Sequence, residues 1–261
     1  MRVRPSFVLP LAALLALCIY RAEVKLDEAS AEGSGAPAPT AQTTPAPAAP
    51  AQPAPPPAPA RPRGPNLLSV RGEVALRKRP GGDAVALVGP TTQFGSPRVL
   101  NVAARRGEWL GVVTDEQPNG RLAWVKGEDG ALRGSRTSWS VHADLSERRV
   151  ELRRGGRTVR RLSVAVGTST SPTPPGRYAV TDKISGSRYG PYYGCCILAL
   201  TGHQTNPPPG WTGGDRLAIH GTDAPSTIGS AASAGCLRAA DADLEVLMRL
   251  VPLGAPVIVR A

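Results

Sequence analysis

The sequence is poor in several residue types that particular functions require. Aromatic residues make up only 4% of the chain, and histidine occurs three times. The excess of basic residues is spread along the chain, and lysine occurs only at Lys25, Lys78, Lys126 and Lys183. A nucleic-acid-binding surface presents clusters of Lys and Arg with interleaved aromatic side chains. We therefore expect no nucleic-acid partner, and a net charge of +11 instead predicts a general attraction to anionic cell-wall polymers or membrane surfaces.

Cysteine is also scarce, with four residues at positions 18, 195, 196 and 236. They form no Cys-x-x-Cys motif, which argues against a thiol oxidoreductase, and no paired Cys/His spacing, so we expect no metal site. Cys195 and Cys196 are neighbours in an apolar run, where successive strand residues point to opposite faces. We expect two buried thiols there, with a regulatory bond to Cys236 as the alternative.

The first 66 residues predict an export segment and a tether. Residues 7–20 form an apolar run of 14 residues after Arg2 and Arg4, shorter than the roughly 20 residues of a spanning helix. Residues 1–22 are expected to be a signal peptide or short membrane anchor, and lipidation of Cys18 is a further alternative. Residues 23–66 include twelve Pro and ten Ala between Gly35 and Pro65, which predicts an extended tether. We expect an exported protein of the periplasm or cell envelope, with possible membrane association through its N-terminus.

Residues 67–137 predict short strands separated by turns. Residues 109–113 and 122–125 are apolar and flank a Pro118-Asn119-Gly120-Arg121 turn, which favours a hairpin. This part resembles the bacterial SH3-like modules that accompany wall enzymes, and the resemblance implies a small β-barrel. Such a module binds peptidoglycan or packs on the next domain as a spacer, and the sequence leaves both open.

Residues 138–261 are also mainly β in pattern. Apolar and polar residues alternate over 138–146, further strands are expected near residues 150, 164, 178, 198 and 218, and residues 256–260 close the chain as a strand. One helix is predicted, with Asp241 as its cap and Leu244, Leu247, Met248 and Val251 at helical spacing. The fold class expected for the whole chain is therefore mainly β with one late helix.

Two residues of this part suggest nucleophilic catalysis. Cys236 follows Gly235, which leaves the sulfur accessible, and His220 ends a predicted strand sixteen residues upstream. A histidine can accept the proton of a thiol and return it to a leaving amine. The surrounding motifs are Thr173-Pro174-Pro175-Gly176, His220-Gly221-Thr222 and Ser233-Ala234-Gly235-Cys236-Leu237-Arg238.

In their order and content these motifs resemble the catalytic domain of L,D-transpeptidases, the YkuD-like family, over residues 138–261. The resemblance implies Cys236 as nucleophile, His220 as base and Gly221 as the residue whose carbonyl orients the histidine. It also implies an oxyanion hole at the N–H groups of Gly235 and Cys236. Substrate contacts are expected from Arg238, Ser233 and Tyr193, although bracing of the loop is favoured for Arg238 and Ser233. The aromatic residues Tyr189, Tyr192, Tyr193 and Trp211 are expected to form either a lid or ordinary loop packing.

One position departs from the family pattern, because Ala234 stands where the family usually has a histidine. We expect chemistry to survive this change, since that histidine is not the principal base. His203 is the other candidate source of an imidazole, although a solvated loop position is the favoured interpretation.

The resemblance implies an enzyme that acylates its cysteine with a peptidoglycan stem tetrapeptide, releases D-Ala and transfers the acyl group to an amine of a second stem. The product is a 3→3 cross-link, and no cofactor is needed. The alternatives are hydrolysis of stem peptides and a wall-binding protein with impaired catalysis.

Overall fold

The computed structural model of the protein describes residues 64–261. The predicted export segment, residues 1–22, and the tether up to residue 63 lie outside the described residues. Strands dominate the described part, which contains a single α-helix of ten residues. The mainly β fold with one late helix is therefore confirmed.

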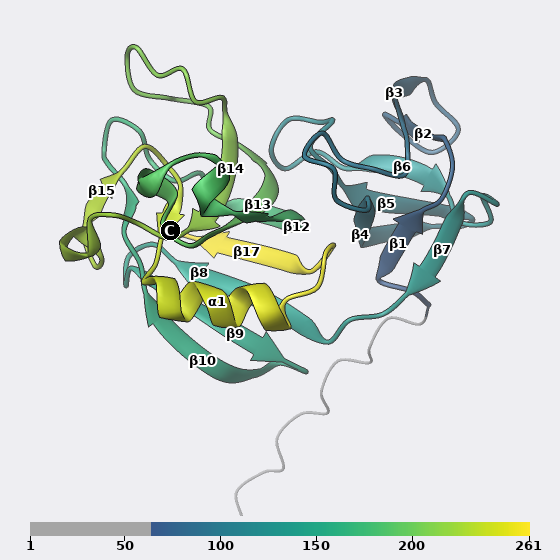
Figure 1. The fold of residues 1–261 in the computed structure, drawn as a ribbon. Coiled ribbons are helices and arrows are strands. Elements are labelled where there is room, and N and C mark those ends of the chain that lie inside the picture. The colour runs from purple at the N-terminus through teal and green to yellow at the C-terminus, as the bar shows by residue number, and fades with distance from the viewer. Residues whose placement is uncertain (1–63) are drawn as a thin grey trace, which may run out of the picture. The chain divides into compact units, whose positions relative to one another are not determined.

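Residues 67–135 build the first sheet, which has seven strands in the order β3-β2-β6-β5-β4-β1-β7 (Figure 1). All its neighbouring strands pair antiparallel. Its core contains Leu68, Leu76 and Val112, each almost fully buried. The strands are β1 (Leu67–Val70), β2 (Val74–Arg77), β3 (Ala84–Val88), β4 (Val99–Arg106), β5 (Trp109–Val113), β6 (Ala123–Lys126) and β7 (Leu132–Ser135). We call residues 67–135 the N-terminal module, and its description as SH3-like stays a prediction.

The expected hairpin of the N-terminal module is present. Strands β5 and β6 pair antiparallel, and the N–H of Arg121 donates to the carbonyl of Pro118 across the turn at 3.0 Å. Gly120 has a φ of +79° at this turn, a conformation that glycine adopts without steric cost. The Pro-Asn-Gly sequence therefore set this turn locally.

Residues 139–260 build the second sheet, with eight strands in the order β10-β9-β8-β17-β12-β13-β14-β16. The last strand, β17, lies between β8 and β12, parallel to the first and antiparallel to the second (Figure 1). A two-stranded parallel pair, β11 (Val166–Gly167) and β15 (Ala231–Ser233), accompanies it. The strands of the large sheet are β8 (Trp139–Asp144), β9 (Arg149–Arg154), β10 (Arg157–Ser163), β12 (Gly176–Ser185), β13 (Cys196–His203), β14 (Arg216–His220), β16 (Leu237–Arg238) and β17 (Pro256–Arg260).

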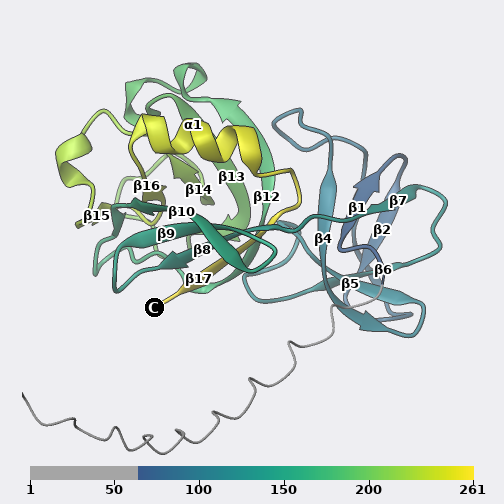
Figure 2. The same ribbon diagram turned by 90° about the horizontal axis from the view of Figure 1, so that it is seen from below.

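The helix α1 (Asp241–Leu250) packs on β13 and β14 (Figure 2). It buries Leu244 and Leu247 in the main core. Asp241 was expected to cap it, and this prediction is wrong. Ala240 is the cap residue and makes no side-chain cap bond, while Asp241 is the first helical residue. An acidic side chain in the first turn still favours the helix, because it faces the positive end of the helix dipole.

Three short 3-10 helices lie in the connections of the second sheet, at Gly186–Arg188, Pro191–Tyr193 and Pro225–Thr227. The second of them carries two aromatic residues next to β13. Within residues 64–261, no helix has the length and apolar character needed to cross a bilayer.

Cys195 and Cys196 are joined by a disulfide bond, so the expectation of two thiols is wrong. Strand β13 begins only at Cys196, and Cys195 follows Gly194, whose φ is +56°. Cys195 therefore lies in a turn, where the strand alternation used for the prediction does not apply. Within the described part of the chain Cys236 is the free cysteine, so the alternative of a bond to Cys236 is also contradicted.

Candidate active site

Cys236 lies in a tight loop between β15 and β16. The hydroxyl of Ser233 donates to the carbonyl of Cys236 at 2.6 Å and accepts from the N–H of Gly235 at 3.1 Å. Gly235 has a φ of +118°, which side chains rarely tolerate, and a Cβ there would clash with Gln204. Ser233 and Gly235 thus fix the loop that presents the thiol, and Ser233 braces it rather than facing a substrate.

Gln204, which sequence reasoning missed, holds the same loop from the other side. Its amide Nε2 donates to the carbonyls of Ala234 at 2.7 Å and Pro172 at 3.1 Å, and the side chain is buried. Gln204 follows β13, thirty residues before Ala234, so no local pattern pointed to it. Gln204 thus contacts the backbone of Ala234, the position at which the family pattern has a histidine.

The predicted oxyanion hole is corrected at one of its two donors. The N–H of Gly235 is occupied by the Ser233 hydroxyl, so it does not point freely at a substrate. Among the described residues, the N–H of Cys236 has no acceptor. The loop turns at Gly235, so that the N–H of Gly235 meets the Ser233 hydroxyl. Of the two predicted donors, only the N–H of Cys236 is then available to an oxyanion.

His220 ends β14 and is fully buried. Its Nδ1 lies 2.6 Å from the carbonyl of Gly221, and because a carbonyl only accepts, Nδ1 must carry the proton. The opposite atom, Nε2, is then an acceptor, and it has no hydrogen-bond partner in the described residues. The expected contact between Gly221 and the histidine is present, and it leaves Nε2 as a buried basic nitrogen without a partner among the described residues.

Gly221 has little room for a side chain. A Cβ at this position would clash with the Asp241 carboxylate and lie 2.9 Å from the Cα of Gly194. The backbone carbonyl that orients His220 is therefore packed between the start of α1 and the turn before β13. This packing fixes the imidazole without a carboxylate partner.

Burial keeps both reacting groups neutral. It lowers the pKa of His220 to about 4 and raises the pKa of the Cys236 thiol. The N–H of Ala218 and the charge of Arg238 oppose the second shift only in part. The sulfur lies 3.9 Å from the carbonyl of Arg216, and no hydrogen bond joins it to His220 in the described part of the chain. The resting site thus holds a thiol and a neutral imidazole rather than an ion pair.

Arg238 and two tyrosines surround the histidine. The rings of Tyr193 and Tyr192 lie 4.9 and 5.7 Å from the imidazole. The Arg238 guanidinium donates to the Tyr192 hydroxyl and stacks on the Tyr192 ring at 4.6 Å. Arg238 is buried, so these contacts support its bracing role over contact with a substrate carboxylate.

A cleft that is partly open to solvent joins these groups. It is lined by Cys236 and His220 and by all four aromatic residues considered as a lid. Most of the other lining residues are apolar or small, namely Phe94, Ile184, Ile197, Ala199, Leu217, Ala218, Ala234, Gly213 and Gly214; Gln204 and Arg216 complete it. Residues 64–261 contain no cluster of three or more His, Cys, Asp or Glu side chains able to hold a metal.

His203 does not line the cleft, and the expectation that it is solvated is wrong. Its Nδ1 lies 2.9 Å from Asp215 and its Nε2 lies 2.8 Å from the carbonyl of Asp115. Asn119 bonds to its backbone in both directions. Because Asp115 and Asn119 belong to the N-terminal module, His203 joins that module to the second sheet. It supplies no imidazole in place of the one missing at Ala234.

Residues 138–259 match the family model described as YkuD, the L,D-transpeptidase catalytic domain. A protein of Bacillus licheniformis named "Putative L,D-transpeptidase YkuD" is 29% identical over 121 residues, covering 46% of this chain and 64% of that protein. The match thus spans less than two thirds of the relative's length.

Among solved structures, L,D-transpeptidase 3 of Mycobacterium tuberculosis with a faropenem-derived adduct is 18% identical, with a TM-score of 0.41 over 54% of this chain and 73% of that one. An L,D-transpeptidase of Mycobacterium smegmatis is 17% identical, with a TM-score of 0.40 over 62% and 82% of the two chains. The catalytic domain of the E. faecium L,D-transpeptidase is 22% identical, with a TM-score of 0.35 over 47% and 96%.

Proposed function

Because residues 138–259 belong to the YkuD family of L,D-transpeptidase catalytic domains, we propose that this protein is a cysteine-dependent L,D-transpeptidase. It would form 3→3 cross-links between peptidoglycan stem peptides. One observation carries the proposal. The imidazole of His220 donates Nδ1–H to Gly221 and keeps a free Nε2 in the cleft that also holds the Cys236 thiol.

In the first half-reaction, His220 Nε2 accepts the proton of the Cys236 thiol as the sulfur attacks the carbonyl carbon that precedes the terminal D-Ala. The carbon–nitrogen bond then breaks, and the imidazolium returns the proton to the leaving D-Ala amine. A thioester on Cys236 remains. In the second, the side-chain amine of another stem attacks the thioester, His220 takes the amine proton, and the sulfur leaves and regains that proton.

The electrostatics of the cleft suit this cycle. Because burial disfavours the imidazolium of His220, a proton accepted from the thiol passes readily to the leaving amine. The negative charge of the tetrahedral intermediate needs a donor, and the N–H of Cys236 is the donor that remains available. Proton transfer is expected once a substrate carbonyl is in place, since the two resting groups are neutral.

We further propose that the enzyme acts in the cell envelope. The support is the short apolar run of residues 7–20 after two arginines, together with the peptidoglycan substrate. The Pro- and Ala-rich residues after it would let the catalytic part reach the wall.

A product assay tests the proposed function. Purified protein is incubated with a stem tetrapeptide alone and with an amine acceptor stem, and the products are separated by mass. We expect D-Ala release and a cross-linked dimer when the acceptor is present. Release of tripeptide without dimer formation would favour the hydrolase. Absence of both products, with the peptide still bound, would favour the wall-binding protein.

A further inference from the structure

The N-terminal module contributes one residue, Phe94, to the lining of the cleft. Phe94 stands at the tip of the connection between β3 and β4, in a tight turn closed by Thr92 N–H to the Ser96 carbonyl at 2.9 Å and Gly95 N–H to the Thr92 carbonyl at 3.0 Å. Gly95 takes a φ of +89° there. The turn therefore holds its own shape, and we call residues 91–97 the Phe94 loop.

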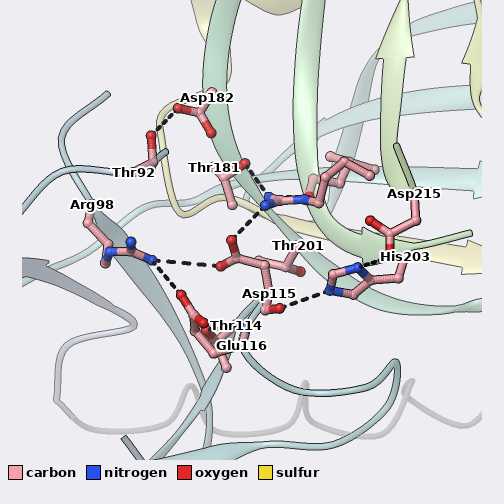
Figure 3. A network of polar contacts seen from close by, with 12 residues as sticks. Thr92, Arg98, Thr114, Asp115, Glu116, Thr181, Asp182, Thr201, His203 and Asp215 are labelled. Atoms are coloured by element: carbon pink, nitrogen blue, oxygen red, sulfur yellow. Dashed lines mark hydrogen bonds and ion pairs between the residues drawn. The ribbon is translucent and has the colours of Figure 1, made fainter. Parts of the chain in front are cut away.

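The Phe94 loop is bonded to the sheet that carries the site. The hydroxyl of Thr92 donates to the carboxylate of Asp182 on β12, which is fully buried (Figure 3). Asp115, after β5, accepts from the Arg216 guanidinium at 2.6 Å, and Arg98 lies 3.8 Å from the same carboxylate. Residues 64–261 lie within one compact unit, and these bonds fix the position of the loop within it.

Phe94 and Cys236 pack on the same apolar cluster. Its members are Ile184, Ile197, Ala199 and Ala218, and Phe94, Tyr193 and Cys236 lie against it. The Arg216 guanidinium lies 6.0 Å from the centre of the Phe94 ring, while the carbonyl of Arg216 lies 3.9 Å from the Cys236 sulfur. The side chain of Arg216 thus lies near the Phe94 ring and its carbonyl lies near the Cys236 sulfur, so both groups face the same part of the cleft.

This part of the cleft suits an uncharged substrate group. Arg216 is the one formally charged residue among those that line the described cleft, and its guanidinium is engaged by Asp115, the Thr181 hydroxyl and the Leu200 carbonyl. Phe94 is half-buried and lines the cleft. An apolar surface excludes charge and favours a hydrocarbon group.

We propose that Phe94 is a specificity-determining residue that contacts the hydrocarbon part of the acyl-donor stem peptide. The N-terminal module then forms part of the donor site. This role differs from the two considered above, in which the module binds the wall by its own surface or acts as a spacer. This inference rests on the proposed function, because it takes the donor to be a stem peptide.

The test compares Phe94→Ala, Phe94→Leu and Leu87→Ala, each in a Cys236→Ala background that binds without turnover. Leu87 belongs to the same module and is 64% exposed, so its removal tests binding by the outer surface of the module. The dissociation constant of a stem tetrapeptide is measured by calorimetry. We expect Phe94→Ala to raise it about 10-fold, equal to about 1.4 kcal/mol, while the other two stay within twofold.

A second readout separates specificity from support of the thiol. With Cys236 present, the rate of alkylation by iodoacetamide is expected to be the same in the parent and in Phe94→Ala. A loss of alkylation that matches the loss of affinity would assign Phe94 to support of the thiol and overturn the inference. An unchanged dissociation constant in Phe94→Ala, or no tetrapeptide binding at all, would also overturn it.

The inference and the proposed function fail separately. If the parent binds the tetrapeptide without converting it, and Phe94→Ala weakens that binding, the proposed function fails and the role of Phe94 stands. If the parent forms the cross-link and Phe94→Ala binds as tightly as the parent, the proposed function stands and the role of Phe94 fails.

Discussion

At the scale of single residues, the proposed mechanism makes the Cys236 thiol depend on His220, a base that burial keeps neutral. The lone pair of His220 Nε2 is available at any pH well above about 4, the value to which burial lowers its pKa. As the pH falls through that value the imidazole becomes protonated and loses its function as a base. The acylation rate of the parent should therefore decline on the acidic side only when the pH approaches about 4.

Replacing the base should expose the intrinsic acidity of the thiol. In His220→Ala the thiolate forms only by ionisation of Cys236, whose pKa burial raises. We expect acylation at pH 7 to fall by about 100-fold or more and to recover in part only at a pH beyond about 8.5, the ordinary pKa of a thiol, because burial places the pKa of Cys236 higher. Stopped-flow acylation across pH measures this, with His142→Ala on β8 as the matched control. Equal rates for His220→Ala and the parent at pH 7 would remove His220 from the mechanism.

Ala234 is the residue at which the chain leaves the family pattern. Its carbonyl is held by Gln204 and its side chain lines the cleft, while the base position is filled by His220. We expect Ala234→His to remain active and to change the acylation rate by less than about tenfold, as measured beside the parent. An inert parent with an active Ala234→His variant would show that the missing histidine is essential.

At the scale of elements, the loop between β15 and β16 owes its shape to hydrogen bonds on two sides. Ser233 closes it internally, and Gln204 holds the Ala234 carbonyl from beyond β13. Gln204 is therefore a positioning residue, because it acts on the thiol through the backbone of the loop.

Gln204→Met keeps the volume of the side chain but removes both donors. The part-buried carbonyls of Ala234 and Pro172 each lose a partner, which costs up to about 1 kcal/mol of stability for each group left unpaired. We expect kcat to fall about tenfold with little change in KM, and the pH profile of Cys236 alkylation to shift. Gln117→Ala, which removes a solvent-exposed side-chain hydrogen bond in the N-terminal module, is the control. A variant with parental kcat and an unchanged alkylation profile would contradict the positioning role.

Element boundaries in the second sheet were predictable to the extent that they depend on local patterns. Residues 139–144 alternate because one face of β8 meets the core, and Leu244 and Leu247 mark the buried side of α1. The state of Cys195 was not predictable, since it depends on the turn at Gly194 rather than on the strand period. The cap of α1 also escaped prediction, because Ala240 has no side chain that signals a cap.

At the scale of the whole molecule, contacts between residues far apart in sequence complete the site. Cys236 and His220 were predicted as site residues because local motifs surround them, and both line the same cleft. Phe94 and Asp115 stand more than a hundred residues before Cys236, and nothing local shows that they reach the second sheet. Long-range packing of this kind leaves no periodic trace in a sequence, so it required the structure.

The pair between Asp115 and Arg216 should contribute measurably to stability. Both side chains are 14% exposed, and their atoms approach to 2.6 Å. Asp115→Ala leaves a mostly buried guanidinium without its carboxylate, so we expect the free energy of unfolding to fall by about 3 kcal/mol.

A matched control shows whether the loss of stability in Asp115→Ala comes from the burial of the ion pair or from ion pairing alone. Glu108 pairs with Lys126 at 3.1 Å, but both side chains are 53% exposed, so Glu108→Ala should cost less than about 1 kcal/mol. Urea denaturation of the two variants beside the parent measures the difference. Equal losses in both would show that the Asp115 contact adds no more than a surface pair.

The most direct test of the account is the mass of the protein after exposure to a carbapenem, whose acyl carbon stands in for the donor carbonyl. In a protein that starts after the predicted export segment and so lacks Cys18, the proposed mechanism predicts one adduct on the parent, mapped to Cys236, and none on Cys236→Ser, because the disulfide leaves Cys195 and Cys196 without a thiol. An adduct that persists in Cys236→Ser, or that maps to Cys195 or Cys196 in the parent, would contradict it.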